Sequence, residues 1–122
     1  MGWHFVPQIP VYLQIISRNR ADILSGHYPA DSQIPSVRQL ALEAAVNPNT
    51  MQRALGELES EGLLYTRGTA GRFVTDDTTV LEKARQIQMR EELHRLLEQA
   101  KALGLSKAEF LCYIDEKEEW KV

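Results

Sequence analysis

The sequence predicts a mainly α-helical protein with one small β-hairpin, in two parts that cover residues 1–77 and 78–122. Three observations support this fold class. Apolar residues recur at helical spacing over much of the chain, which is typical of amphipathic helices. Two short β-favouring runs flank a glycine-containing tip near residue 70, which is the pattern of a hairpin. From residue 78 onward a long charged segment has leucines at helical spacing.

The first predicted helix runs from about Pro10 to Ser25 and has its large apolar residues at spacings compatible with one face. Gly26 follows it, where a helix C-terminus commonly needs a left-handed residue. Residues 3–6, before the helix, predict a short extended piece. Residues 27–33, after it, lack a helical period and predict a loop.

Two further helices follow, separated by a turn of about three residues. Ser36 is placed to cap the first, because a serine side chain there accepts a hydrogen bond from the first helical turn. Asn47 is placed to cap the second, and Pro48 occupies its first position, where a missing N–H has no cost. Two helices joined by so short a turn form a helix-turn-helix, whose second helix is of the kind that enters a DNA major groove.

The second of these helices ends near Gly62, and two β-favouring runs follow. They cover Leu63–Arg67 and Arg72–Thr75, and the tip between them has glycine at both ends. This arrangement predicts a hairpin packed beside the helix-turn-helix.

A long helix is predicted from Thr78 to Leu103, with Thr79 and Glu82 at the spacing of a capping box. Gly104 ends it. A second capping box, Ser106 to Glu109, opens a last helix that carries apolar residues as far as Trp120. Two helices joined by so short a link form an antiparallel hairpin.

This helical hairpin has too much apolar surface to be stable alone in water, so it needs a partner. The partner is either the first part of the chain or a second copy of the hairpin, and we prefer the second copy. The residues expected at the interface between two copies are Leu93, Leu96, Leu97, Phe110, Leu111 and Ile114.

The formal net charge of the chain is −3, whereas DNA-binding domains are often basic. The distribution of charge matters more than its sum. Four of the six arginines before residue 77 fall within residues 34–74, the stretch that contains the helix-turn-helix and the hairpin. A locally positive face is sufficient for binding, with weaker non-specific affinity.

No apolar run approaches the roughly 18 residues of a membrane span, and the first residues lack the pattern of a signal peptide. We therefore expect a cytoplasmic protein without a membrane partner. Cys112 is the one cysteine, so neither a disulfide framework nor a thiolate metal site is expected. Glu91 and His94 have half of a di-iron spacing, but their charged neighbours favour a solvated helix face. No cofactor and no enzymatic motif is predicted.

Four segments together carry a resemblance to a known family: PVYLQI, IPSVRQLA, VNPNTMQRALGELESEGLLYTR and GRFV, within residues 10–75. In order and spacing they resemble the GntR family of bacterial transcription regulators, in particular its short-tailed YtrA-like branch. The resemblance implies a winged helix-turn-helix that binds operator DNA as a homodimer. It also implies that the two C-terminal helices are the dimerisation element.

The resemblance also indicates which residues contact DNA. Arg38 matches a family arginine that contacts DNA, and Asn49, Thr50 and Gln52 match positions that touch the operator in relatives, with Arg53 beside them. Asparagine can pair with adenine and arginine with guanine, whereas arginines outside the groove mostly bind phosphates. The full set expected to bind DNA is Ser36, Arg38, Asn49, Thr50, Gln52, Arg53, Arg67, Thr69, Gly71 and Arg72.

Two departures from the family pattern affect these expectations. The wing reads Arg67-Gly68-Thr69-Ala70-Gly71-Arg72, so the basic residue common at the tip is lost and Arg72 follows the tip instead. Ala45 stands in the turn where relatives commonly have glycine. If its backbone is left-handed, alanine there costs roughly 1 kcal/mol relative to glycine.

The sequence therefore predicts a sequence-specific transcription regulator, a repressor that binds a palindromic operator as a homodimer. The alternative is a winged-helix module that binds protein and not DNA. A third possibility is the DNA-binding part of a regulator fused to an aminotransferase-like domain, for which 122 residues are too few. The sequence identifies no small-molecule effector.

Overall fold

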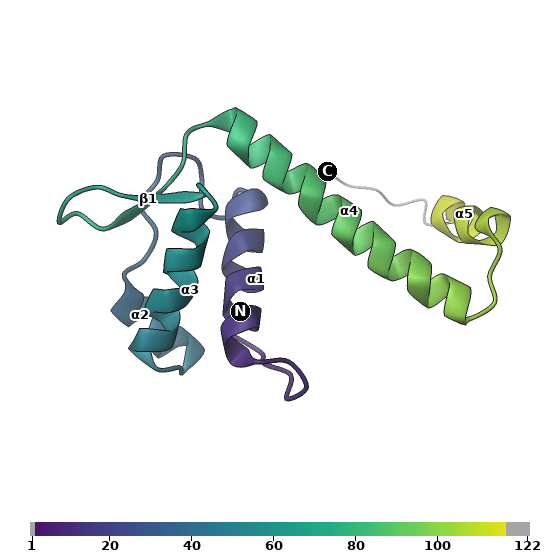
Figure 1. Ribbon diagram of the computed structural model, residues 1–122, viewed down its shortest axis with the longest axis horizontal. Helices are drawn as coiled ribbons and strands as arrows, with labels where there is room; N and C mark the ends of the chain where they lie inside the picture. Colours follow the sequence, from purple (N-terminus) through teal and green to yellow (C-terminus); the bar gives the residue numbers. More distant parts are fainter. Residues whose placement is uncertain (1, 117–122) are drawn as a thin grey trace. The chain divides into compact units, whose positions relative to one another are not determined.

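The computed structural model describes residues 2–116. Its elements, in chain order, are α1 (Val11–Leu24), α2 (Val37–Ala44), α3 (Pro48–Ser60), β1 (Leu64–Thr66), β2 (Arg72–Val74), α4 (Thr78–Ala102) and α5 (Lys107–Glu116). The predicted fold class, mainly helical with a small hairpin, is confirmed (Figure 1). The described residues form two compact units that divide between Arg85 and Gln86.

The core of the first unit lies between three helices, with α3 packed against both α1 and α2 (Figure 1). β1 and β2 pair in antiparallel fashion, with Leu64 opposite Val74, and place apolar residues under α3. The largest fully buried side chains are Ile15, Leu40, Met51, Leu55, Leu58, Leu63, Val74 and Asn19. This core fixes the position of α3, whose opposite face is exposed.

The predicted caps around the turn are confirmed. The Ser36 hydroxyl accepts a hydrogen bond from the backbone N–H of Gln39 at 3.1 Å. The Asn47 side-chain oxygen accepts one from the backbone N–H of Asn49 at 2.7 Å, and Pro48 is the first residue of α3. Both helices of the pair therefore begin where these side chains satisfy an N–H that has no partner within the helix.

The start of α4 differs from the prediction. Asp77, and not Thr79, caps the helix: its Oδ1 accepts from the backbone N–H groups of Thr79 at 3.0 Å and Val80 at 3.3 Å. Glu82 pairs instead with Arg85. The predicted Thr79–Glu82 capping box is wrong because the helix begins at Thr78, and a carboxylate in front of that residue is a favoured cap.

The second predicted capping box, at the start of α5, is confirmed. The Glu109 carboxylate accepts from the backbone N–H of Ser106 at 3.0 Å, and the Ser106 hydroxyl accepts from that of Glu109 at 3.1 Å. The hydrogen bond from the Ser106 backbone lowers the pKa of Glu109. The predicted contribution of Trp120 to this helix falls outside the described residues.

The first compact unit extends beyond residue 77, where the sequence predicts the boundary between the two parts. Leu81 of α4 is buried in the core of this unit. The Arg85 guanidinium also donates to the carbonyl oxygen of Leu24, at 3.0 Å and 3.3 Å. The first turns of α4 are therefore part of the helix-turn-helix unit, although the composition of the chain already changes at residue 78.

Ala45 has the left-handed backbone that the sequence suggested, with φ 56° and ψ 47°. An L-residue with a Cβ is strained in this region, and glycine is not. We expect Ala45→Gly to stabilise the protein by about 1 kcal/mol, which raises the melting temperature by about 4 to 8 °C. Thermal unfolding followed by circular dichroism measures the change.

The matched control for this prediction is Ala44→Gly. Ala44 is the last residue of α2 and is buried, so glycine there removes packing and adds backbone freedom. We expect the control to lower the melting temperature. An unchanged or lower value for Ala45→Gly would contradict a strained turn at residue 45.

Asn19 is an unexpected polar residue within the aliphatic face of α1. It is 1% exposed, and its Nδ2 contacts the Met51 sulfur at 3.8 Å. Its Oδ1 has no hydrogen-bond partner among the described residues. A buried polar atom without a partner costs free energy that an aliphatic side chain of similar size avoids.

We therefore expect Asn19→Leu to raise the free energy of unfolding by about 1–3 kcal/mol, as measured by urea denaturation. Asn19→Asp, which puts a charge in the same place, should lower it. Destabilisation by Asn19→Leu would show that the folded protein satisfies the amide.

Candidate nucleic-acid interface

The exposed face of α3 consists of polar side chains. Asn49, Gln52 and Arg53 are exposed, and Thr50 is half-buried, whereas the apolar residues between them face the core. This division follows from the helical period, because positions three and four apart share a face. Four of the residues expected to bind DNA are thus together at the N-terminal end of one helix.

Arg53 is supported from a neighbouring helix. Its guanidinium lies over the ring of Tyr12 in α1, 4.5 Å from the ring centroid. A cation above an aromatic face is attracted by the electron-rich ring, which limits how far the side chain can move. No local pattern predicts this contact, because forty residues of chain separate Tyr12 from Arg53.

Ser36 and Arg38 are both exposed at the N-terminal end of α2. The Ser36 hydroxyl is already engaged as the cap of this helix. Arg38 has no ion-pair partner within residues 2–116, so its guanidinium is available to a phosphate group.

The wing contains Arg67 just after β1, and this side chain is folded back onto the protein. Its Nη2 donates to Asp31 Oδ1 at 3.1 Å and to the hydroxyl of Tyr65, and its guanidinium lies 4.1 Å from the centroid of the Phe73 ring. The Tyr65 hydroxyl in turn donates to Asp31 Oδ1 at 2.6 Å, and this hydrogen bond raises the pKa of Tyr65. The hydrogen bond between Arg67 and Tyr65 raises the pKa of Arg67. Half of the Arg67 side chain remains exposed, so a phosphate contact would compete with these partners.

Residues 31–34, before α2, form hydrogen bonds with β2, the strand that also pairs with β1. Backbone hydrogen bonds link Asp31 and Ser32 to Val74, each at 2.9 Å, and Ile34 to Arg72 at 3.0 Å. The sequence predicts a loop for residues 27–33, which overlap this segment. The segment pairs with β2 over residues 31–34, and no local pattern reveals this, because the partner lies about forty residues further along the chain.

The tip of the wing contains Thr69, which is exposed, and Gly71. The amide of Gln33 donates to the carbonyl oxygen of Ala70 and lies only 3.1 Å from where a Cβ on Gly71 would be. Gly71 also has φ +112°, which other residues rarely adopt. Glycine at residue 71 is therefore required by the fold, whatever its role with DNA.

Arg72 lies at the junction of the wing and α3. Only 15% of its side chain is exposed, and its Nε donates to Glu59 Oε1. Its Nη1 donates to Gln52 Oε1 at 3.4 Å. The structure thus brings Arg72 and Gln52 together, and it adds Glu59, a residue that sequence reasoning did not include.

The second unit contains the residues expected at a dimer interface. Leu93, Leu96, Leu111 and Ile114 are 45–48% exposed, and Leu97 is half-buried. Phe110 is only 9% exposed in the single chain. Four of the six residues therefore present apolar surface outward.

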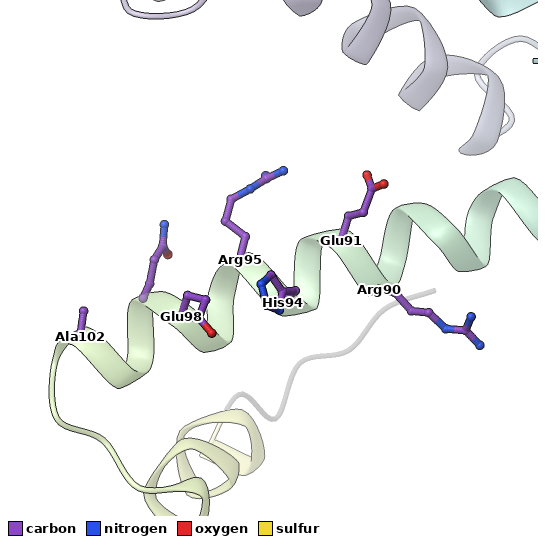
Figure 2. Close-up of a pocket in the computed structure, with 7 residues that line it drawn as sticks. Arg90, Glu91, His94, Arg95, Glu98 and Ala102 are labelled. Carbon is purple, nitrogen blue, oxygen red and sulfur yellow. The ribbon is translucent and has the colours of Figure 1, made fainter.

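Figure 2 shows residues of α4 that line a pocket in this unit. Glu91 and Arg95 project from one side of the helix, and Arg90 projects from the opposite side. Among residues 2–116, no three His, Cys, Asp or Glu side chains are grouped closely enough to hold a metal ion. His94 lines the pocket together with the charged side chains of Glu91, Arg95 and Glu98. No helix in the described part of the chain has the length and apolar character needed to cross a membrane.

Comparison with known proteins assigns residues 11–74 to a family described as bacterial regulatory proteins, gntR family. The chain is 33% identical to the HTH-type transcriptional repressor YtrA of Bacillus subtilis (strain 168) over 97 residues, which is 79% of this chain and 75% of that protein. It is similar to the structure of a GntR family transcriptional regulator from Listeria monocytogenes, with a TM-score of 0.84, 29% identity and coverage of 92% and 98% of the two chains.

The chain is also similar to the structure of AraR(DBD) in complex with operator ORX1. The TM-score is 0.56 at 29% identity, and the match covers 62% of this chain and 95% of that one. The likeness therefore extends to a DNA-binding domain whose structure includes its operator.

Proposed function

The chain belongs to the GntR family of bacterial regulatory proteins and is a DNA-binding transcription regulator; we propose that it is a repressor that binds a palindromic operator as a homodimer. The observation that carries the proposal is the joint presence of a polar recognition face on α3 and exposed leucines on α4. An operator of a bacterial gene lies in the cytoplasm, so the proposal also places the protein there.

The groove-reading role is assigned to the first turns of α3. Residues near the N-terminus of a recognition helix contact base edges, and Asn49, Thr50, Gln52 and Arg53 occupy that part of α3. Arg38 at the start of α2 would bind the phosphate backbone beside it. Backbone contacts position the protein, and base contacts specify the sequence.

The dimer is assigned to the hairpin of α4 and α5. The exposed faces of Leu93, Leu96, Leu111 and Ile114 form apolar surface that a second copy would cover. A two-fold dimer has the same patch on both chains, and its symmetry is mirrored in a palindromic site. Repression is favoured by the similarity to the repressor YtrA over most of both chains.

The alternative of a winged-helix module that binds protein has no observation in its favour. Such a module would use apolar residues on the exposed face of its recognition helix. Apart from Pro48 at the first position of the helix, the exposed side chains of α3 are Asn49, Gln52, Arg53, Glu57 and Ser60, all of them polar.

Sedimentation and selection from random duplexes together test the proposal. The purified chain has a mass of 13.9 kDa, and the proposal predicts a species of twice that mass. The selected duplexes should contain an inverted repeat whose half-sites are about one helical turn, or a multiple of it, apart. A monomer that selects a single, non-repeated site would overturn the proposal.

A further inference from the structure

A partly buried arginine, Arg72, joins the wing to the recognition helix. The Arg72 side chain is only 15% exposed although it carries a full charge, and its Nε donates to the Glu59 carboxylate. The same carboxylate oxygen accepts from the Thr66 hydroxyl at 3.1 Å. Strand β2 opposes β1 at this point, since Thr66 and Arg72 are register partners. The Glu59 carboxylate of α3 is therefore hydrogen-bonded to one residue from each strand of the wing, Thr66 of β1 and Arg72 of β2.

This environment is unsuited to a phosphate contact. A guanidinium that binds DNA by releasing counterions must reach the backbone from solvent. That of Arg72 is largely covered, and its charge is already compensated by Glu59. Moving it to a phosphate would leave the Glu59 carboxylate without its partner.

The Nη1 atom of the same guanidinium contacts Gln52 on the exposed face of α3. Arg72 Nη1 donates to the side-chain carbonyl oxygen of Gln52 at 3.4 Å. A glutamine amide has an acceptor at one end and a donor at the other, and an arginine has donors only. Only the oxygen of Gln52 can therefore turn toward Arg72, and its amino group is the part left to face outward.

The orientation of this amide decides which base Gln52 can read. Bidentate pairing with adenine uses the amide oxygen as an acceptor and the amide nitrogen as a donor. An amide whose oxygen accepts from Arg72 has one lone pair left on that oxygen and both of its N–H donors, so its donors outnumber its acceptors. The major-groove edge of guanine consists of two acceptors, N7 and O6. It can therefore pair with the amide N–H donors and needs no acceptor from Gln52, whereas bidentate pairing with adenine does.

We propose that Arg72 is a positioning residue that turns the amide of Gln52 so that its amino group reads guanine. The inference rests on the proposed assignment of Gln52 to the groove. It gives the arginine that follows the wing tip a part in sequence recognition, although most of its side chain is covered by the protein.

Selection from random duplexes with wild type, Arg72→Ala, Gln52→Ala and the double variant tests this inference. We expect both single variants to lose the guanine preference at the same base pair in each half-site, by roughly ten-fold or more in relative affinity. The double variant should select the same sequences as Gln52→Ala, because Arg72 acts only through Gln52.

Arg72→Lys is the matched control, since lysine keeps the charge but lacks the planar fork that holds two partners at once. A positioning role predicts that the guanine preference falls in Arg72→Lys as well. A phosphate contact predicts that Arg72→Lys binds like wild type, and that Arg72→Ala weakens binding to all sequences whether residue 52 is glutamine or alanine. That result would overturn the inference.

The experiment also distinguishes failure of the inference from failure of the proposed function and from an unfolded variant. Wild type that selects no sequence would contradict the proposed function itself. If circular dichroism shows that Arg72→Ala is unfolded, the variant R72M/E59Q, which removes both charges together, replaces it in the same comparison. Retention of the guanine preference in folded R72M/E59Q would also overturn the inference.

Discussion

Leu96→Glu is expected to convert the protein to a monomer and to lower its affinity for a palindromic operator by at least about 100-fold. Leu96 is 48% exposed in a single chain, and the proposed dimer buries it against the second copy. A carboxylate taken into that interface without a partner is strongly unfavourable. Once the dimer is lost, each half-site must be bound separately, and the gain from linked binding is lost with it.

Sedimentation velocity measures the first effect, and fluorescence anisotropy with labelled operator measures the second. The matched control is Gln99→Glu, which adds the same acid at another exposed position of α4 and should leave both quantities unchanged. If Leu96→Glu remains a dimer at the concentrations at which wild type dimerises, the interface lies elsewhere.

Asn49→Ala is expected to reduce the preference for operator over random DNA on the order of 10- to 100-fold. The Asn49 side chain is exposed at the start of α3, where bidentate pairing with adenine is possible. The Asn49 side chain can be removed without loss of the helix cap, because the Asn47 side chain accepts from the backbone N–H of residue 49 and not from its side chain. Alanine therefore keeps the cap and removes only the amide.

Arg38→Ala provides the contrast. A phosphate contact carries no sequence information, so this variant should lose affinity equally on operator and random DNA. The slope of log affinity against log salt concentration should become shallower by about one unit. Equal losses on the two DNAs for Asn49→Ala would contradict its base-reading role.

The local features of the fold follow closely from the sequence. Ser36, Asn47 and the pair Ser106–Glu109 cap their helices as predicted, because capping depends on a few consecutive residues. The start of α4 was predicted wrongly for a related reason. Asp77, Thr78 and Thr79 can all cap a helix, and the residue pattern alone does not decide between them.

The candidate site was less predictable, because its contacts join distant parts of the chain. The pattern places Arg67 and Arg72 at exposed ends of strands, where arginines commonly bind phosphates. Their partners Asp31 and Glu59 become neighbours only when the segment before α2 and the helix α3 pack around the wing. A residue type and its spacing predict which face it occupies, but not which partner engages its charge.

The most direct test of the account is a gel-shift titration of the full chain on the upstream region of its own gene, at two salt concentrations. Random DNA of equal length is the competitor. The account predicts a discrete complex that resists the competitor and weakens as salt rises, since phosphate contacts supply much of the affinity. Equal binding to upstream and random DNA at both salt concentrations would contradict it.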